Sequence, residues 1–528
     1  MNEHQNLLSS AIQLHQSGRI PEALDFYNKV LAWQQNNAQL LDLVGTANLQ
    51  IGHMEQGIEL IQRSLTLNPR NPLAHINIGV ALQRLKRLDE ALASYDKALT
   101  INPGHASAYN NQGVALRDLK RLDEALASYG KALAINPDYA DAYFNRGIAL
   151  QELKRLDEAL TNYDKALAIN PDYADAYCGR GSAQHELMRL DEALASYDNA
   201  IANKHDHAKA YFNKSMALLL NGDFDRGWEL YEWRFKQATL RRSSQFSQRH
   251  WLGEESLEGK TILLHAEQGL GDTIQFCRYA KPVSDLGAKV FLEVQKPLVG
   301  LLRGLEGVTA LIEHGQPRPA FDYHCPLLSL PFALKTKLIS IPHPTSYLHA
   351  EEAKVRYWQG RIEISPRLKV GVVWNGGFRP DQPEIWAVNE RRNIPLEVFC
   401  QGLNAVNADF FSLQKGEQAE AELRLRQQEY WPQGNFHNFM DEIKDFSDTA
   451  ALISNLDVIV TVDTSTAHLS AALGKPTWIV NRFDTCWRWL LGRDDSPWYQ
   501  SVKLYRQAED QAWQPVLRRV VSDLTKLA

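Results

Sequence analysis

The sequence predicts a multidomain protein in which an all-α array of helical repeats is followed by an α/β region made of two halves. Two observations predict this division. Nearly identical blocks recur every 34 residues through the first part of the chain, and short apolar runs alternate with helical patterns through the second part. The chain has 528 residues, and at roughly 150 residues per domain that is enough for several buried cores.

The repeats share a block that first appears as Arg87-Leu-Asp-Glu-Ala-Leu-Ala-Ser-Tyr95 and returns, identical or nearly so, at 121–129, 155–163 and 189–197. Extending this register predicts seven units that begin near residues 4, 38, 72, 106, 140, 174 and 208. Small residues and an aromatic or apolar residue hold fixed places in each unit. This pattern predicts two antiparallel helices per unit, with close helix contact at the small residues. A proline closes four of the units, at Pro69, Pro103, Pro137 and Pro171.

One position of the array indicates a binding face. The sixth residues of five successive units are Asn77, Asn111, Asn145, Gly179 and Asn213. The row resembles the asparagine ladder with which the repeats of O-GlcNAc transferases hold a peptide, and an amide can both donate to and accept from an extended main chain. We therefore expect a polypeptide on the concave face of the array. The alternative is that asparagine here suits repeat packing or was copied by duplication.

Beyond Gln237 the period stops and the pattern becomes α/β. We expect strands at 261–265 and 290–294 in one series and at 368–374, 410–413, 457–462 and 476–480 in a second. The predicted domains are an array over 1–240, a linker over 241–259, and two Rossmann-like halves over 260–365 and 366–528. Such halves bind ligands beyond the carboxyl ends of their strands, so the site is expected in the cleft between them.

The first candidate motif is Glu267-Gln-Gly-Leu-Gly-Asp-Thr273, which follows the strand that ends at His265. Gly269 and Gly271 permit a tight turn and close backbone approach. Asp272 is expected near a helix start at 272 or 273, where a carboxylate is favoured. The alternative is that Asp272 only caps this helix.

The second candidate motif follows the strand that ends at Val462 and opens a helix. It supplies a carboxylate, three hydroxyls and an imidazole, from Asp463, Thr464, Ser465, Thr466 and His468. Unpaired N–H groups and a partial positive charge make a helix N-terminus suitable for phosphate. The alternative is ordinary capping by Asp463 or Thr464.

Three basic residues are expected near the same cleft. Arg391 and Arg392 precede a helix in the segment Asn389-Glu-Arg-Arg-Asn393, and Lys415 follows a strand. Together they would neutralise a diphosphate. Each could instead be a solvated surface charge.

These segments resemble the repeat-fused branch of glycosyltransferase family 9, the family of the heptosyltransferases, and the repeats resemble the tetratricopeptide repeat (TPR). The segments that carry the first resemblance are Gln268-Gly-Leu-Gly-Asp-Thr-Ile-Gln-Phe276, Cys325-Pro-Leu-Leu-Ser-Leu-Pro331, Asp463-Thr-Ser-Thr-Ala-His-Leu469 and Trp487-Arg-Trp-Leu-Leu-Gly-Arg493. The resemblance implies a GT-B fold, inverting transfer from a nucleotide-diphosphate sugar, and no catalytic metal or other cofactor. It assigns the acceptor side to 260–365, the donor side to 366–528, the general base to Asp272, and the diphosphate to the loop from Asp463 to His468.

The expected function is therefore a glycosyltransferase whose acceptor, a protein, is presented by the TPR array. Two alternatives stay open: an interaction scaffold with an inactive transferase-like domain, and transfer to a saccharide or lipid intermediate. A net charge of −6 argues against nucleic acid as a partner. The scattered cysteines and the lack of a signal peptide or long apolar run predict a cytoplasmic protein without a transmembrane segment. The one D-x-D sequence, Asp223-Phe-Asp225, is expected to cap a repeat helix rather than hold a metal.

Overall fold

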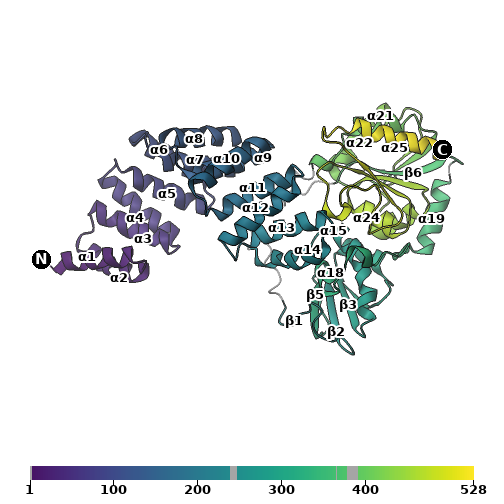
Figure 1. Ribbon diagram of the computed structural model, residues 1–528, viewed down its shortest axis with the longest axis horizontal. Helices are drawn as coiled ribbons and strands as arrows, with labels where there is room; N and C mark the ends of the chain where they lie inside the picture. Colours follow the sequence, from purple (N-terminus) through teal and green to yellow (C-terminus); the bar gives the residue numbers. More distant parts are fainter. Residues whose placement is uncertain (1–2, 238–245, 364, 377–389) are drawn as a thin grey trace. The chain divides into compact units, whose positions relative to one another are not determined.

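The structure is a computed structural model, and it describes residues 3–237, 246–363, 365–376 and 390–528 (Figure 1). The chain divides into two compact units, Met1–Ala210 and Tyr211–Ala528. The first unit is all-α, and the second contains two parallel sheets with helices on them. The predicted fold class, a TPR superhelix followed by an α/β fold of the GT-B type, is confirmed.

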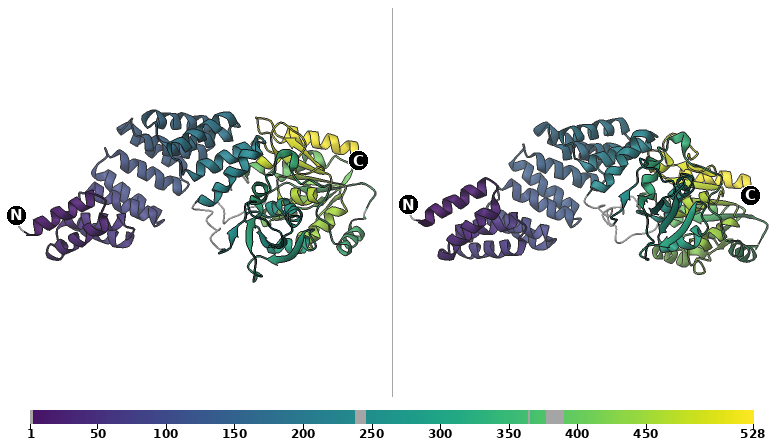
Figure 2. Two further views of the ribbon diagram at one scale, coloured as in Figure 1. Left: turned by 60° about the horizontal axis from the view of Figure 1, so that its bottom comes forward. Right: turned by 90° about the horizontal axis from the view of Figure 1, so that it is seen from below.

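The array consists of helix pairs stacked along the chain, and Figure 2 shows the pairs from two further directions. From the second repeat on, the first helix of each pair begins at the predicted unit start. The helices are α1 (Glu3–Gln16), α2 (Ile20–Trp33), α3 (Ala38–Gln50), α4 (Met54–Leu67), α5 (Pro72–Arg84), α6 (Leu88–Ile101), α7 (Ala106–Asp118), α8 (Leu122–Ile135), α9 (Ala140–Glu152), α10 (Leu156–Ile169), α11 (Ala174–Glu186), α12 (Leu190–Asn203), α13 (Ala208–Leu220) and α14 (Phe224–Tyr231).

Close packing inside each repeat explains the small and aromatic positions. A Cβ atom added to Gly79 would lie 2.5 Å from Cε1 of Tyr95, and Gly113 stands in the same relation to Tyr129. Both tyrosines are fully buried. Since no side chain fits at these glycines, the aromatic ring of the second helix lies directly against the backbone of the first. Helices α4, α6, α8 and α10 each end two residues before the proline that closes the unit, as predicted.

The first sheet of the second unit has the strand order β1-β5-β2-β3-β4, and all its pairs are parallel. Its strands are β1 (Arg249–His250), β2 (Thr261–His265), β3 (Lys289–Val294), β4 (Val308–Glu313) and β5 (Tyr323–Pro326). Its helices are α15 (Leu270–Phe276), α16 (Ala280–Ser284), α17 (Val299–Leu302) and α18 (Leu330–Ala333). Strand β1 lies in the stretch 241–259 that was expected as a linker, of which 241–245 fall outside the described residues.

The second sheet has the order β11-β10-β9-β6-β7-β8, again entirely parallel, with helices on both faces (Figure 1). Its strands are β6 (Leu368–Val373), β7 (Ala408–Ser412), β8 (Phe436–His437), β9 (Val458–Val462), β10 (Thr477–Asn481) and β11 (Val502–Arg506). Its helices are α19 (Glu352–Ile362), α21 (Leu396–Leu403), α22 (Glu417–Tyr430), α23 (Phe446–Ser454), α24 (Ser465–Ala472) and α25 (Gln514–Leu527). The central strands are buried along their whole length, as expected for a parallel sheet covered on both faces.

The seventh repeat belongs, from Tyr211 on, to the second unit rather than the first. Trp228 of α14 is buried, and its ring centroid lies 5.2 Å from that of Trp487 and 6.3 Å from that of Phe276. Arg234, just after α14, is also buried and donates to Glu267 and to Ser329. The last repeat is therefore part of the core of the α/β unit.

Candidate functional site

The two predicted loops, one from each half of the α/β unit, meet at Gly271. A Cβ atom added there would lie 2.9 Å from Cδ2 of His468 and 3.4 Å from Cα of Ser465. Helix α15 therefore packs with its first turn against the first turn of α24. Helix α15 follows β2 of the first sheet, and α24 follows β9 of the second sheet. The contact between the two helices therefore lies where the carboxyl ends of the two sheets face each other.

Asp272 is the carboxylate at this junction. Its Oδ2 accepts a hydrogen bond of 3.0 Å from the backbone N–H of Gly269, and its Oδ1 is paired with the guanidinium of Arg488. Its side chain is 16% exposed. The helix begins at Leu270, so the predicted start at 272 or 273 is wrong, because Asp272 caps the helix from inside its first turn. Capping and a role in chemistry are thus both open to this residue.

Arg488 is a site residue that sequence reasoning missed. It lies in the short 3-10 helix Trp487–Trp489, with its guanidinium carbon 4.2 Å from the ring centroid of Trp487 and Nη1 donating to Sγ of Cys486 at 3.0 Å. Its side chain is 12% exposed. The signal in the sequence is a basic residue between two tryptophans, in Trp487-Arg-Trp, within a segment that carries the family resemblance.

His468 is a buried residue of α24. Its Nδ1 lies 2.9 Å from the hydroxyl of Tyr499, and its ring stacks on Trp489 with centroids 5.2 Å apart. Burial lowers the pKa of this imidazole to about 4. The ring is therefore neutral near pH 7, where it can donate through one nitrogen and accept through the other.

The loop before α24 combines capping with open backbone donors. Thr464 is the N-cap, and its Oγ1 accepts from the N–H of Ala467 at 3.4 Å. The backbone oxygen of Asp463 accepts from Nη1 of Arg392 at 3.2 Å. Ser465 and Thr466 form the first turn. The capping alternative is thus observed for Thr464, while the following N–H groups keep the arrangement that binds anions.

The three predicted cations do not all reach this loop. Arg392 lies on it and also donates to the backbone oxygen of Gly376 at 2.9 Å. Arg391 is instead paired with Asp484 at 2.9 Å, and Nζ of Lys415 donates to the backbone oxygen of Met440 at 2.8 Å. Asn389 of the same motif falls outside the described residues. Of the three, Arg392 is the one that the structure places against the loop from Asp463.

The asparagine row lies on the first helices of the repeats and is partly buried. Nδ2 of Asn77 donates to Oγ1 of Thr46 at 3.2 Å, and Nδ2 of Asn145 donates to Oδ1 of Asn110 at 3.0 Å. Asn111 accepts from Asn110 at 3.5 Å, and Asn213 belongs to α13. Some of these amides thus link one repeat to the next, as the packing alternative expects, and the peptide-binding role stays a prediction.

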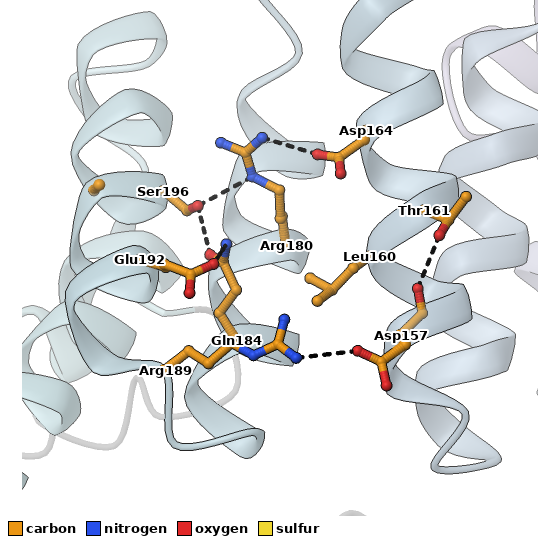
Figure 3. A pocket seen from close by; sticks show the side chains of 10 residues that line it. Asp157, Leu160, Thr161, Asp164, Arg180, Gln184, Arg189, Glu192 and Ser196 are labelled. Carbon is orange, nitrogen blue, oxygen red and sulfur yellow. Dashed lines mark hydrogen bonds and ion pairs between the residues drawn. The ribbon is translucent and has the colours of Figure 1, made fainter.

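A cavity of about 600 Å³ lies in the array between α10 and the pair α11 and α12 (Figure 3). Its two arginines are matched by aspartates: Arg180 donates to Asp164 at 3.0 Å and Arg189 to Asp157 at 3.3 Å. Because these charges already pair within the array, the cavity does not resemble a site built for an anionic donor.

The part of the chain that the structure describes contains neither a cluster of potential metal ligands nor a helix suited to cross a membrane. No group of three or more His, Cys, Asp or Glu side chains there is arranged to hold a metal ion. Asp223, the first residue of the D-x-D sequence, is the N-cap of α14 and accepts from the N–H of Arg226 at 3.1 Å, as predicted. Within the same described residues, no helix has both the length and the apolar character that a membrane crossing requires.

Models of known protein families match segments in both parts of the chain. A model described as glycosyltransferase family 9 (heptosyltransferase) matches residues 426–479. Tetratricopeptide-repeat models match residues 72–105, 94–127 and 178–232, and a TPR repeat model matches 113–154 and 152–187. The chain therefore carries TPR repeats in its N-terminal region and a family 9 glycosyltransferase segment near its C-terminus, and this prediction is confirmed.

The individual proteins that resemble this chain share about a quarter of its residues or fewer over the matched regions. Protein FlbA of Caulobacter vibrioides is 26% identical over 342 residues, which are 60% of this chain and 55% of that protein. This chain thus spans about half the length of that curated relative. Among solved structures, the MamA protein is 24% identical with a TM-score of 0.29, over 33% of this chain and 94% of that one. A tetratricopeptide repeat protein from Parabacteroides merdae is 17% identical with a TM-score of 0.39, over 44% and 92%.

Proposed function

We propose that this protein is an inverting, metal-independent glycosyltransferase that uses a nucleotide-diphosphate sugar and acts on a protein acceptor presented by the TPR array. The observation that carries the proposal is the junction at Gly271, the residue before Asp272, which lies against the first turn of α24. A general base and an anion-binding helix end from opposite halves are the two groups that such a transfer needs.

The donor diphosphate would lie at the first turn of α24. The N–H groups there supply hydrogen bonds and a partial positive charge, and Arg392 adds a full positive charge beside Asp463. The neutral ring of His468 offers one further N–H at the same turn. Stabilisation of the leaving diphosphate by these groups takes the place of a metal ion.

The chemical step is a single displacement at the anomeric carbon. As the acceptor nucleophile attacks that carbon, its proton passes to the carboxylate of Asp272. The bond between the anomeric carbon and the phosphate oxygen breaks, and its electron pair leaves with the nucleoside diphosphate. The configuration inverts because attack and departure occur on opposite faces.

A protein acceptor is proposed because the recognition part of the chain is a TPR array joined to the α/β unit through its seventh repeat. Trp228 and Arg234 of that repeat pack against the same half that holds Asp272. An array of repeats offers an extended concave surface suited to a polypeptide. The asparagine row on the first helices is the proposed contact.

Donor binding tests the site. Calorimetry of the full chain against ADP-, GDP-, CDP-, UDP- and dTDP-sugars should find one donor class that binds, and Arg392→Ala should weaken that binding by about tenfold or more. Arg518 is exposed on α25, so Arg518→Ala is the matched control and should bind as the wild type does. Binding of no donor in this panel would contradict the proposed function and favour a scaffold.

Turnover tests the chemistry. With the donor so identified, Asp272→Asn should abolish transfer to protein acceptors in a cell extract, because the amide cannot take the proton. Transfer by the wild type should persist in EDTA. Retained turnover in Asp272→Asn would remove this residue from the role of base, and loss of turnover in EDTA would contradict the metal-independent mechanism.

A further inference from the structure

Arg488 is a largely buried cation, 12% exposed, with fewer acceptors around it than it has N–H groups. A guanidinium has five N–H donors and stays charged at any pH at which the protein is folded. Its Nη2 is paired with Asp272 and its Nη1 donates to a thiol, which is a weak acceptor, while its Nε is buried and has no hydrogen-bond partner among the described residues. Burial of a charge with donors left over costs free energy, so this arrangement suits a ligand that supplies more acceptor oxygens.

Asp272, the partner, has a hydrogen bond on each of its two oxygens in the same state. Oδ2 accepts from the N–H of Gly269 and Oδ1 accepts from Arg488. A carboxylate that is to take a proton from an acceptor must present an open lone pair to it. The guanidinium lies on the oxygen that does not cap the helix, so it competes with an acceptor for that oxygen.

The position of Arg488 also places it next to the donor loop. Trp489, its neighbour in the same 3-10 helix, stacks on His468 of α24. Gly271, which precedes Asp272, also lies against the ring of His468. The pair of Arg488 and Asp272 therefore lies against the first turn of α24, where the diphosphate is expected.

We propose that Arg488 is exchanged between Asp272 and the donor diphosphate. Without donor, it covers the carboxylate. When the diphosphate binds, its oxygens take the guanidinium in a two-pronged contact, and Oδ1 of Asp272 becomes free to accept a proton. The base is then available only when a donor is in place, which fixes the order of binding as donor before acceptor. This inference rests on the proposed function, since it assigns a second duty to the same site.

A double-mutant cycle on diphosphate binding tests the exchange. Calorimetry uses the full chain and ADP, GDP, CDP, UDP and dTDP, so that no sugar is hydrolysed during the measurement. Arg488→Ala should weaken binding by about tenfold to a hundredfold, the range for hydrogen bonds to a charged group. Asp272→Asn should tighten it by about threefold to tenfold, because the guanidinium no longer has to leave a carboxylate. The double variant should bind as weakly as Arg488→Ala does, because the gain from Asp272→Asn requires Arg488.

Other outcomes overturn the inference. If Asp272→Asn leaves affinity unchanged, or tightens it equally in the Arg488→Ala background, Arg488 is not shared between the two groups. If the wild type binds no diphosphate, the proposed function fails with it. If the wild type binds but Arg488→Ala does not weaken binding, the inference alone fails. Arg488→Lys keeps the charge without the fork, and an affinity between those of Arg488→Ala and wild type is expected. Should Arg488→Ala not fold, the cycle is run on Arg488→Lys, where the gain from Asp272→Asn should shrink.

Discussion

The array and the α/β unit bury their side chains by different routes. In the array, Tyr95 fills the space beside Gly79 of its own repeat, and the same contact returns in the next repeat. In the α/β unit, the guanidinium of Arg278 donates to the backbone oxygen of Trp498, 220 residues away, and Arg488 reaches Asp272 over 216. Local contacts build the array one repeat at a time, whereas contacts distant in sequence build the site.

The ion pairs of the array and of the α/β unit also differ, in how far they are exposed to water. Ion pairs such as Arg87 with Glu90 and Arg121 with Glu124 lie exposed on array helices, one turn apart. In the α/β unit, Arg234 is 1% exposed and paired with both Glu232 and Glu267. Water screens the first kind of pair and not the second, so the comparison can be tested by removing one arginine of each kind.

The largest effect is expected from Arg234→Met. Loss of the guanidinium leaves Glu232 and Glu267, which are only 15% and 14% exposed, without their cation, and this costs about 3–5 kcal/mol. Urea unfolding followed by tryptophan fluorescence measures it, because every tryptophan except Trp33 lies at 228 or beyond. Arg518→Met, on an exposed site, is the control. A loss in Arg234→Met no larger than in the control would show that the seventh repeat is not anchored through this network.

The second largest effect is expected at acid pH, which should destabilise the α/β unit. Burial lowers the pKa of His265 to about 3 and that of His468 to about 4, from an ordinary value of 6.5. The unfolded chain then binds more protons than the folded chain below pH 6.5, so their contribution is complete above that pH and is lost as the pH falls toward 4. Between pH 7 and 5 the loss is about 1–2 kcal/mol for each histidine.

The measurement is urea unfolding by fluorescence at both pH values. His468→Gln, which does not titrate, should reduce the dependence on pH. An equal dependence in the variant and the wild type would contradict the assignment to this histidine.

Within the array, Gly113→Ala should cost about 1–3 kcal/mol, because the new methyl group overlaps the ring of Tyr129. Gly130, inside α8, has open space around its Cα, so Gly130→Ala is a matched control that should stabilise by about 0.4–1 kcal/mol. Far-UV circular dichroism during urea unfolding follows the helices of the array. The idea of close packing at Gly113 would be abandoned if both variants moved the midpoint in the same direction.

The smallest effect is expected from Arg121→Ala. The pair with Glu124 is exposed, so the midpoint of the same unfolding curve should stay within error of the wild type. A clear fall would mean that the surface pairs of the array form a network, and the contrast with Arg234 would lose its basis.

The same contrast explains what the sequence could predict. Repetition shows which residue faces which, so the start of every first helix from α3 to α13 could be read from the 34-residue period. Strands β2, β6, β9 and β10 follow from their apolar runs. Arg488 could not be assigned in this way, because its partner lies in the other half of the α/β unit and no local pattern joins the two. For Lys415, the sequence could not show the backbone oxygen of Met440 to which its Nζ donates, so its role at the diphosphate stays a prediction.

The contacts of the seventh repeat with the α/β unit limit which parts of the array can change in length. Its buried contacts, through Trp228 and Arg234, tie it to the α/β unit, while each earlier repeat packs mainly on copies of itself. Insertion or loss of a whole 34-residue repeat before residue 208 would leave those contacts intact. An evolving lineage could therefore lengthen or shorten the array in whole repeats without changing the contacts inside the α/β unit.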